Sequence, residues 1–295
     1  QQGIWSKYVT NDLIPRLNGF ELLMASYAMA HLKMDMLLTE TGYKPTDDQR
    51  FKIFLTNSLE EAHPDTQTLF SSWLSDEADQ ANAIKREAPV MVVMGNPPYS
   101  GESANKGEWI MNLMEDYKKE PGGKEKLKER NPKWINDDYV KFMRFGQHFI
   151  DKNGSGILAF INPHGFLDNP TFRGMRWNLL QSFDKIYTID LHGNSKKKEI
   201  TPDGSIDQNV FDIMQGVSIN FLVKTGNKKE KELAKVFHYD LFGKRDLKYD
   251  FLLKNDIKST NYKLLEVSEP NFYFKEKNSE IENIYMNFFN LKELF

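Results

Sequence analysis

The residues best suited to chemistry in this sequence are four consecutive ones, Asn96-Pro97-Pro98-Tyr99. The side-chain amide of Asn96 offers a hydrogen-bond acceptor. Because a residue before proline is pushed out of the helical region, the carbonyls of Asn96 and Pro97 are held in extended geometry. Such a rigid pair of acceptors suits a planar substrate with an exocyclic NH2 group. It withdraws the nitrogen lone pair from the ring, while Tyr99 stacks on the ring face, so that the nitrogen can attack an electrophilic methyl group.

An apolar run, residues 90–94, leads into these four residues. Its valine-rich composition predicts a strand that is buried on both faces, as in a parallel sheet. Pro97 has no N–H, so the strand must stop before it. In open α/β sheets ligands bind just beyond the carboxyl ends of the strands, where we therefore expect Asn96 and Tyr99. The alternative is a proline-stopped strand whose asparagine only caps a turn.

The rest of the chain alternates helical and strand patterns, as an α/β sheet requires. Asn162 and His164 follow one predicted strand, so we expect them on the same edge as Asn96, with His164 satisfied by backbone groups because methyl transfer needs no imidazole. The predicted helices cover residues 22–39, 136–149 and 172–183. The predicted strands cover residues 20–21, 51–57, 157–161, 185–191, 217–223 and 236–239.

Length and composition limit the size of the domain and the class of protein. The 295 residues suffice for one large domain or one and a half, and 40% hydrophobic residues fit a globular core. A net charge of -3 provides no global basic field to attract nucleic acid. The absence of cysteine excludes disulfides, a thiolate zinc site and a cysteine nucleophile, and we expect no metal. No signal peptide or membrane span is evident, so we expect a cytoplasmic protein without a membrane partner.

Three further features could bind a ligand. Glu21 lies where a predicted strand ends and a helix begins, so its carboxylate could accept hydrogen bonds from a ribose or complement the helix dipole. Asn57 ends another short strand, where its amide offers both a donor and an acceptor or forms a turn. The three adjacent lysines at 196–198 could meet phosphates or could be solvated surface charge.

The tetrad, with Glu21 and Asn57 before it and Asn162-Pro163 and Phe211 after it, resembles the γ-arranged N6-adenine DNA methyltransferases, which use S-adenosylmethionine. The resemblance implies that Asn96, Pro97, Pro98 and Tyr99 hold the amino group of a flipped adenine. It implies that Glu21, Asn57 and Asn96 contact the cofactor, and that Phe211 packs on the edge of the base. For Phe211 a core phenylalanine is the alternative.

The run Gly-Phe-Glu-Leu-Leu-Met-Ala-Ser-Tyr, residues 19–27, looks like the methyltransferase region of large single-chain restriction-modification enzymes, of type IIG and the helicase-linked type ISP. The helix around residues 137–142 is similar to theirs, which adds Phe142 to the cofactor-binding residues. The resemblance implies a Rossmann-like class I sheet with helices on both faces and an antiparallel strand near its C-terminal end. Its partners would be double-stranded DNA and endonuclease or helicase domains of the same longer chain.

Two parts of the family pattern are missing. No Gly-x-Gly loop precedes Glu21, and no full recognition domain follows residue 250. We therefore expect a fragment that alone binds S-adenosylmethionine weakly or not at all and does not methylate. Residues 1–245 would be a partial catalytic domain, and residues 246–295 a linker or the start of a target-recognition region. Two other functions stay open, an RNA or protein-glutamine methyltransferase and a non-catalytic nucleic-acid-binding module.

Overall fold

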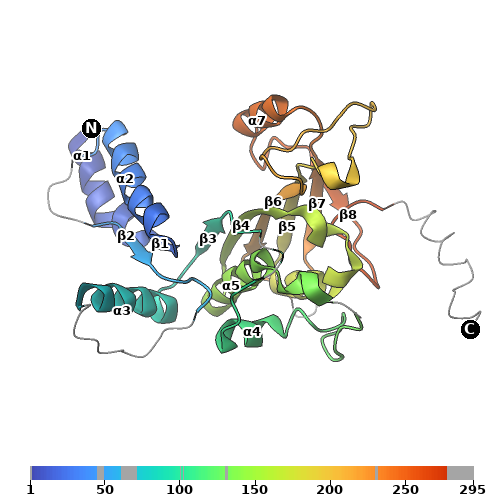
Figure 1. The fold of residues 1–295 in the computed structure, drawn as a ribbon, viewed down its shortest axis with the longest axis horizontal. Coiled ribbons are helices and arrows are strands. Elements are labelled where there is room, and N and C mark those ends of the chain that lie inside the picture. Colours follow the sequence, from blue (N-terminus) through green and yellow to red (C-terminus); the bar gives the residue numbers. More distant parts are fainter. Residues whose placement is uncertain are drawn as a thin grey trace, which may run out of the picture. The chain divides into compact units, whose positions relative to one another are not determined.

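The computed structural model describes residues 2–44, 50–60, 72–99, 101, 103–129, 132–229 and 232–277, which form two compact units (Figure 1). Unit 1 comprises residues 1–89 and 107–110, and unit 2 comprises residues 90–106 and 111–295. Residues 278–295, the end of the predicted linker, lie outside the described residues. Among the described helices, none combines the length and the apolarity that crossing a membrane requires.

Unit 1 is built on a two-stranded parallel sheet in which Glu21 of β1 is in register with Leu55 of β2. Gly42, at φ 81°, follows the long helix α2, as the sequence predicts. A small core of Val9, Ile14, Leu38 and Tyr43 lies beside these elements. The elements are α1 (Gln2–Tyr8), a π-helical turn (Val9–Leu13), a 3-10 turn (Ile14–Arg16), β1 (Asn18–Glu21), α2 (Met24–Glu40), β2 (Lys52–Leu55) and α3 (Ser72–Glu87).

The apolar pattern of α2 correctly predicts a helix, but most of its large apolar side chains are exposed. Met29, Leu32, Met36 and Leu37 are each about half exposed, at 49–55%. The buried contacts of α2 use other positions, where Leu38 enters the small core and Tyr27 donates its hydroxyl hydrogen to buried Glu77 at 3.2 Å. Periodicity therefore identifies the helix but does not show which face is buried.

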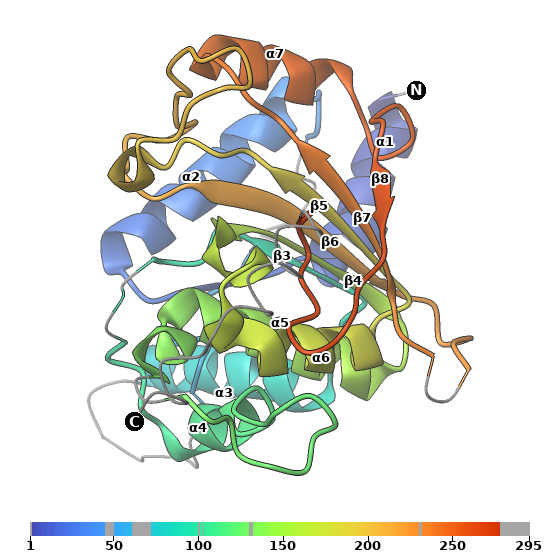
Figure 2. The ribbon, with the colours of Figure 1, turned by 90° about the vertical axis from the view of Figure 1, so that its right-hand side faces the viewer.

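Unit 2 contains a mixed sheet of six strands in the order β3-β4-β6-β5-β7-β8 (Figure 2). Strand β6 runs antiparallel to both β4 and β5, whereas β3 is parallel to β4 and β7 is parallel to β5. The strands are β3 (Val92–Gly95), β4 (Gly156–Pro163), β5 (Lys185–Asp190), β6 (Val217–Lys224), β7 (Lys235–Asp240) and β8 (Lys263–Leu265). The helices are α5 (Asp138–Asn153), α6 (Arg173–Ser182), α7 (Arg245–Lys254) and the end of α4 (Glu108–Met114), whose residues 108–110 belong to unit 1. The 3-10 turns are Pro132–Asn136, His164–Leu167, Pro170–Phe172 and Ser195–Lys197.

Helices cover both faces of this sheet. One row of aligned apolar residues, Val93, Leu158, Leu222, Ile186 and Val236, crosses five strands. Helix α5 packs so closely on this row that a Cβ on its Gly146 would lie 2.5 Å from the Leu158 side chain. Because side chains alternate along a strand, Ile189 and Tyr239 face the other way, where Phe251 of α7 stacks on Tyr239 at 5.2 Å. The fold is the Rossmann-like α/β class that the sequence predicts.

The strand before the tetrad differs from its prediction in burial. Met91, Val92 and Met94 are 60%, 55% and 78% exposed, so the predicted burial on both faces is wrong for this structure. Helix α5 lies on the face of β3 that carries Val93, whereas Val92 and Met94 point to the other face of this edge strand, which within the described residues pairs only with β4. An apolar run shows that a strand forms but does not show how many neighbours it has.

After residue 245 the weak sequence pattern predicts neither α7 nor β8. In the structure β8 pairs antiparallel with β7, and Phe274 is fully buried. The predicted boundary between a catalytic domain and a linker at residue 245 stays a prediction.

Candidate functional site

Unit 2 contains the sheet edge at which the sequence predicts the site. Since β4 and β5 both run antiparallel to β6, they are parallel to each other, and β3 and β7 share their direction. The carboxyl ends of four strands therefore meet at one edge of the sheet. This geometry brings Asn96, His164, His192 and Asp240 to that edge, and it confirms the predicted placement of Asn96 and His164.

At this edge Tyr99 orients Asn96. The Tyr99 hydroxyl donates to Asn96 Oδ1 at 2.6 Å and approaches the Ile161 carbonyl at 3.2 Å. Asn96 is exposed, Pro97 is buried and Pro98 is exposed, so the tetrad presents the amide outward from a fixed base. Burial raises the pKa of Tyr99 to about 12, further above neutral pH, where the phenol is protonated and can donate. An amide oxygen has two lone pairs, and Tyr99 leaves one of them for a substrate N–H.

The two residues predicted to hold the base pack against the same apolar cluster. Tyr99 and Phe211 are both half-buried against a core that includes Val210, Val217 and Leu241. Phe211 also lines a cavity of about 550 Å³, which lies between residues 208–214 and the start of α7. Tyr99 does not line this cavity, so the shared apolar cluster, and not the cavity, brings the two rings to one region.

The predicted cofactor residues of unit 1 both make local hydrogen bonds. Glu21 Oε1 accepts the Leu23 N–H at 2.8 Å, just before α2 begins. Asn57 Oδ1 accepts the Leu59 N–H at 3.0 Å, which is a side-chain turn. Because β1 and β2 are parallel, Glu21 at the end of β1 and Asn57 just after β2 lie at the same edge of the small sheet. In unit 2, Phe142 is half-buried in α5 and meets Phe145 edge-on at 6.2 Å.

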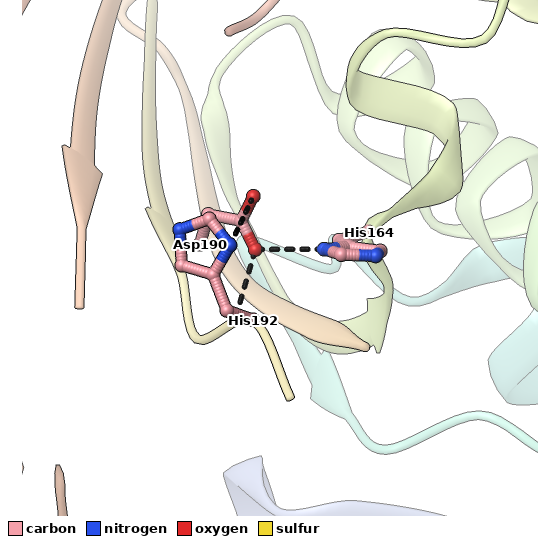
Figure 3. A group of neighbouring side chains, drawn as sticks. All are labelled: His164, Asp190 and His192. Atoms are coloured by element: carbon pink, nitrogen blue, oxygen red, sulfur yellow. Dashed lines mark hydrogen bonds and ion pairs between the residues drawn. The ribbon is translucent and has the colours of Figure 1, made fainter. Parts of the chain in front are cut away.

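The sequence did not predict a cluster of His164, Asp190 and His192 at the functional edge (Figure 3). Asp190 Oδ1 lies 2.8 Å from His164 Nδ1 and accepts the His192 backbone N–H at 3.0 Å, while Oδ2 accepts Lys275 Nζ at 3.0 Å. Asp190 is 1% exposed. The prediction that backbone groups satisfy His164 is wrong, because its ring is held by a buried carboxylate.

His192 connects this cluster to two further acids. Its Nδ1 lies 3.0 Å from Glu199 Oε1 and its Nε2 lies 2.8 Å from Asp240 Oδ1, while its ring stacks on Phe242 with centroids 3.8 Å apart. Its backbone adopts φ 53°, a left-handed conformation that non-glycine residues rarely adopt unless their surroundings fix it.

The acidic and basic groups of the cluster stabilise one another's charged forms. Burial alone would lower the pKa of His192, but hydrogen bonds to Asp240 and Glu199 and the charge of Asp190 raise it to about 9. Burial likewise opposes ionisation of Asp190, yet the His164 hydrogen bond and the nearby cationic groups hold its pKa well below its usual range. At neutral pH the ring of His192 is therefore protonated and lies between carboxylates.

Side-chain atoms of His164, Asp190 and His192 lie within 4.8 Å of one another, a grouping that metal ions use. Here the donors already have other roles, because Asp190 and both nitrogens of His192 form hydrogen bonds. A cation would also meet the Lys275 ammonium on Asp190. The arrangement fits an internal ion network better than a metal centre. The sequence signal was the run Asp-Leu-His-Gly-Asn at the end of a strand, at residues 190–194.

Residues 22–197, more than half of the chain, match the model of the Eco57I restriction-modification methylase family. The chain therefore belongs to this family, and it contains the methyltransferase region of a restriction-modification enzyme. No curated protein matches the chain.

Solved structures show the same fold. The chain is 21% identical to the ATP-dependent Type ISP restriction-modification enzyme LlaBIII bound to DNA, with a TM-score of 0.72 over 96% of this chain and 19% of that one. It is 22% identical to DrdV in a DNA complex, with a TM-score of 0.72 over 95% of this chain and 26% of that one. It is 20% identical to a nuclease-deletion mutant of the Type ISP restriction-modification enzyme LlaGI in complex with a DNA substrate mimic, with a TM-score of 0.73 over 94% of this chain and 26% of that one. The chain thus spans about a quarter or less of each of these structures.

Proposed function

We propose that this chain transfers a methyl group from S-adenosylmethionine to the N6 amine of a flipped adenine in double-stranded DNA, as the catalytic region of a longer restriction-modification enzyme. The observation that carries the proposal is the exposed amide of Asn96, oriented by Tyr99 at the carboxyl edge of the sheet. Membership in the methylase family supports the reaction class. The DNA complexes of structures with the same fold favour DNA over RNA or protein as the substrate.

The chemistry of the tetrad follows from its acceptors. Asn96 Oδ1 and the Pro97 carbonyl accept the two hydrogens of the adenine NH2 group, which leaves the nitrogen lone pair directed away from the ring. Tyr99 and Phe211 hold the base through their shared apolar surroundings. Catalysis then consists of positioning and of stabilising the positive charge that develops on the amine, without a covalent enzyme intermediate.

The residues of unit 1 fit the role of cofactor contacts. Glu21 uses one carboxylate oxygen locally, and the other makes no hydrogen bond among the described residues, so it can accept from ribose hydroxyls. Asn57 stands at the same edge with an amide that can donate and accept. When bound, S-adenosylmethionine supplies the electrophilic methyl group. Phe142 would add an apolar contact from α5.

The central test replaces Asn96 with alanine in the full native polypeptide. We expect Asn96→Ala to lower methyl transfer to duplex DNA by at least about a hundredfold, because an acceptor of the reacting amine is lost, while DNA affinity changes less than about twofold. The measurement is transfer of a labelled methyl group, beside a DNA-binding isotherm. Asn227→Ala is the matched control, since Asn227 is an exposed asparagine in the loop from β6 to β7 at the opposite edge of the sheet.

Retained activity in Asn96→Ala would remove Asn96 from the mechanism. Labelling of ribosomal RNA or of a protein glutamine in preference to DNA would replace the proposed substrate. Binding of DNA without labelling of any of these by the unmodified polypeptide would favour a non-catalytic binding module.

A further inference from the structure

The loop from β5 to β6, residues 191–216, carries three adjacent exposed lysines. Lys196, Lys197 and Lys198 form no side-chain hydrogen bond or ion pair within the part of the chain that the structure describes. The charge of Lys197 helps to lower the pKa of Asp168, but Asp168 already forms an ion pair with Lys277 at 2.9 Å. The three ammonium groups are therefore available to an external anion.

The backbone beneath these lysines is fixed by buried groups. Asn194 Oδ1 accepts the Lys197 N–H at 3.1 Å, and Glu199 Oε2 accepts the Asn194 N–H at 2.9 Å. The other oxygen of Glu199 pairs with Nδ1 of His192, which is 1% exposed. The lysine turn, residues 195–198, is thus attached through Glu199 to the protonated ring of His192.

Neighbouring parts of the loop are held just as firmly. Gly193 adopts φ 79°, and a Cβ there would lie 2.4 Å from the Asn209 Cα, so the two backbones are in close contact. Asn209 Nδ2 also donates to the Gly193 carbonyl at 3.1 Å. From α7, Lys248 Nζ donates to the Leu191 carbonyl at 2.6 Å. The nearby ammonium group of Lys248 is buried and bound to groups of the protein, whereas the three lysines of the turn are exposed.

The lysine turn also lies at the relevant place. Its loop leaves the sheet at the carboxyl end of β5, and β3, which leads into Asn96, ends at the same edge. A duplex whose base reached Asn96 would bring its phosphates to this edge. Held lysines bind phosphates with a smaller loss of chain entropy than mobile ones, so a rigid support favours binding over plain solvation.

We propose that the lysine turn binds backbone phosphates of the duplex DNA, and that His192 and Glu199 are positioning residues that hold it in a binding-competent conformation. This inference rests on the proposed function, because it takes DNA as the ligand. It adds a phosphate-binding surface to a chain whose net charge of -3 gives no general attraction for DNA.

The first experiment measures duplex DNA affinity of the full native polypeptide against salt concentration. For the triple variant Lys196→Gln, Lys197→Gln and Lys198→Gln, we expect affinity at least about tenfold lower at 0.1 M salt and a salt slope smaller by about two to three. The matched control replaces three exposed lysines at the opposite edge of the sheet with glutamine, namely Lys185, Lys229 and Lys235. Equal effects of the two triple variants, or no effect of the first, would overturn the proposal.

The second experiment measures the DNA affinity of Glu199→Gln, because a positioning role predicts weaker binding and simple electrostatics predicts tighter binding. Removing a negative charge beside three lysines would strengthen DNA binding if the lysines acted only as solvated charge. If Glu199 positions the turn, affinity falls by about threefold or more, and the change disappears in the triple-lysine background. Unchanged or tighter binding would refute the positioning role. Both experiments read DNA affinity alone, so their failure is distinct from a failure of the Asn96→Ala test, which reads methyl transfer.

Discussion

The hydroxyl of Tyr99 gives this residue a second role beside the one proposed for its ring. By donating to Asn96 Oδ1 at 2.6 Å, it fixes the rotamer of the amide that would receive the adenine amine. The sequence predicts only a ring that stacks on the base. The hydroxyl contact could not be predicted from residue types alone, because it requires the chain to turn back by three residues around two prolines.

Tyr99→Phe tests this second role. The substitution keeps the ring in its apolar surroundings and removes one hydrogen bond, which contributes about 0.5–1.5 kcal/mol. We therefore expect methyl transfer in the full native polypeptide to fall about threefold to tenfold, mostly through kcat. Tyr239→Phe is the control, since the Tyr239 hydroxyl makes no hydrogen bond among the described residues and its ring stays stacked on Phe251. Equal rates for Tyr99→Phe and the unmodified enzyme would show that the amide is oriented without the phenol.

Among the elements, α7 and the loop of residues 191–216 hold each other in place. Lys248 of α7 and Asp207 of the loop form a fully buried ion pair at 2.8 Å. The Gly243 N–H donates to Asp207 Oδ1 at 2.6 Å, and the Gln208 carbonyl accepts from Lys248 at 2.7 Å. The sequence after residue 245 is rich in lysine and aspartate, which suggests a solvated linker. Tertiary pairing instead buries one lysine completely.

Lys248→Met measures how strongly this pair holds the two elements together. Removing one partner leaves a buried carboxylate unpaired, so we expect the free energy of unfolding to fall by about 3 to 5 kcal/mol in urea titrations. The double variant Lys248→Met and Asp207→Leu removes both charges and should recover a large part of that loss. If the double variant were less stable than Lys248→Met, the unpaired charge of Asp207 would not be the cause of the stability loss in Lys248→Met.

For the whole molecule, the ion network around His192 makes stability depend on pH. The folded pKa of about 9 exceeds the ordinary value of about 6.5, so the network stabilises the folded state fully below pH 6.5. This contribution is lost as pH rises through about 9. Among the described residues, five charged or titratable groups surround His192. They are Asp190 at the end of β5, Asp240 at the end of β7, Glu199 in the loop of residues 191–216, His164 just after β4 and Lys275 in the C-terminal segment.

We therefore expect the contribution of His192 to the free energy of unfolding to fall by up to about 3 kcal/mol between pH 6.5 and pH 9. The measurement is a series of denaturant titrations across this range, in which no cysteine of the chain can titrate. His192→Phe keeps an aromatic ring beside Phe242 and should flatten this part of the profile. A profile that is equally steep in His192→Phe would place the titrating group elsewhere.

Much of the fold could be predicted from the sequence because local patterns encode it. The valine-rich run, the two prolines and the glycine after α5, Gly154 at φ 82°, fix where elements begin and end. They also fix that Asn96 follows a strand, and the strand directions then bring it to the carboxyl edge of the sheet. These features depend on the conformational preferences of neighbouring residues, which act within a few positions along the chain.

Only the tertiary structure decided what surrounds Asn96 and which surfaces are buried. A polar row of Asn162, Ser218, Asp190 and Asp240 crosses four strands in register, and it forms because strand pairing aligns residues that are far apart in sequence. The exposed edge of β3 and the protonated His192 depend in the same way on neighbours that distant segments supply. Sequence periodicity records the type of each element, whereas its partners, and the charges that those partners impose, exist only once the chain has folded.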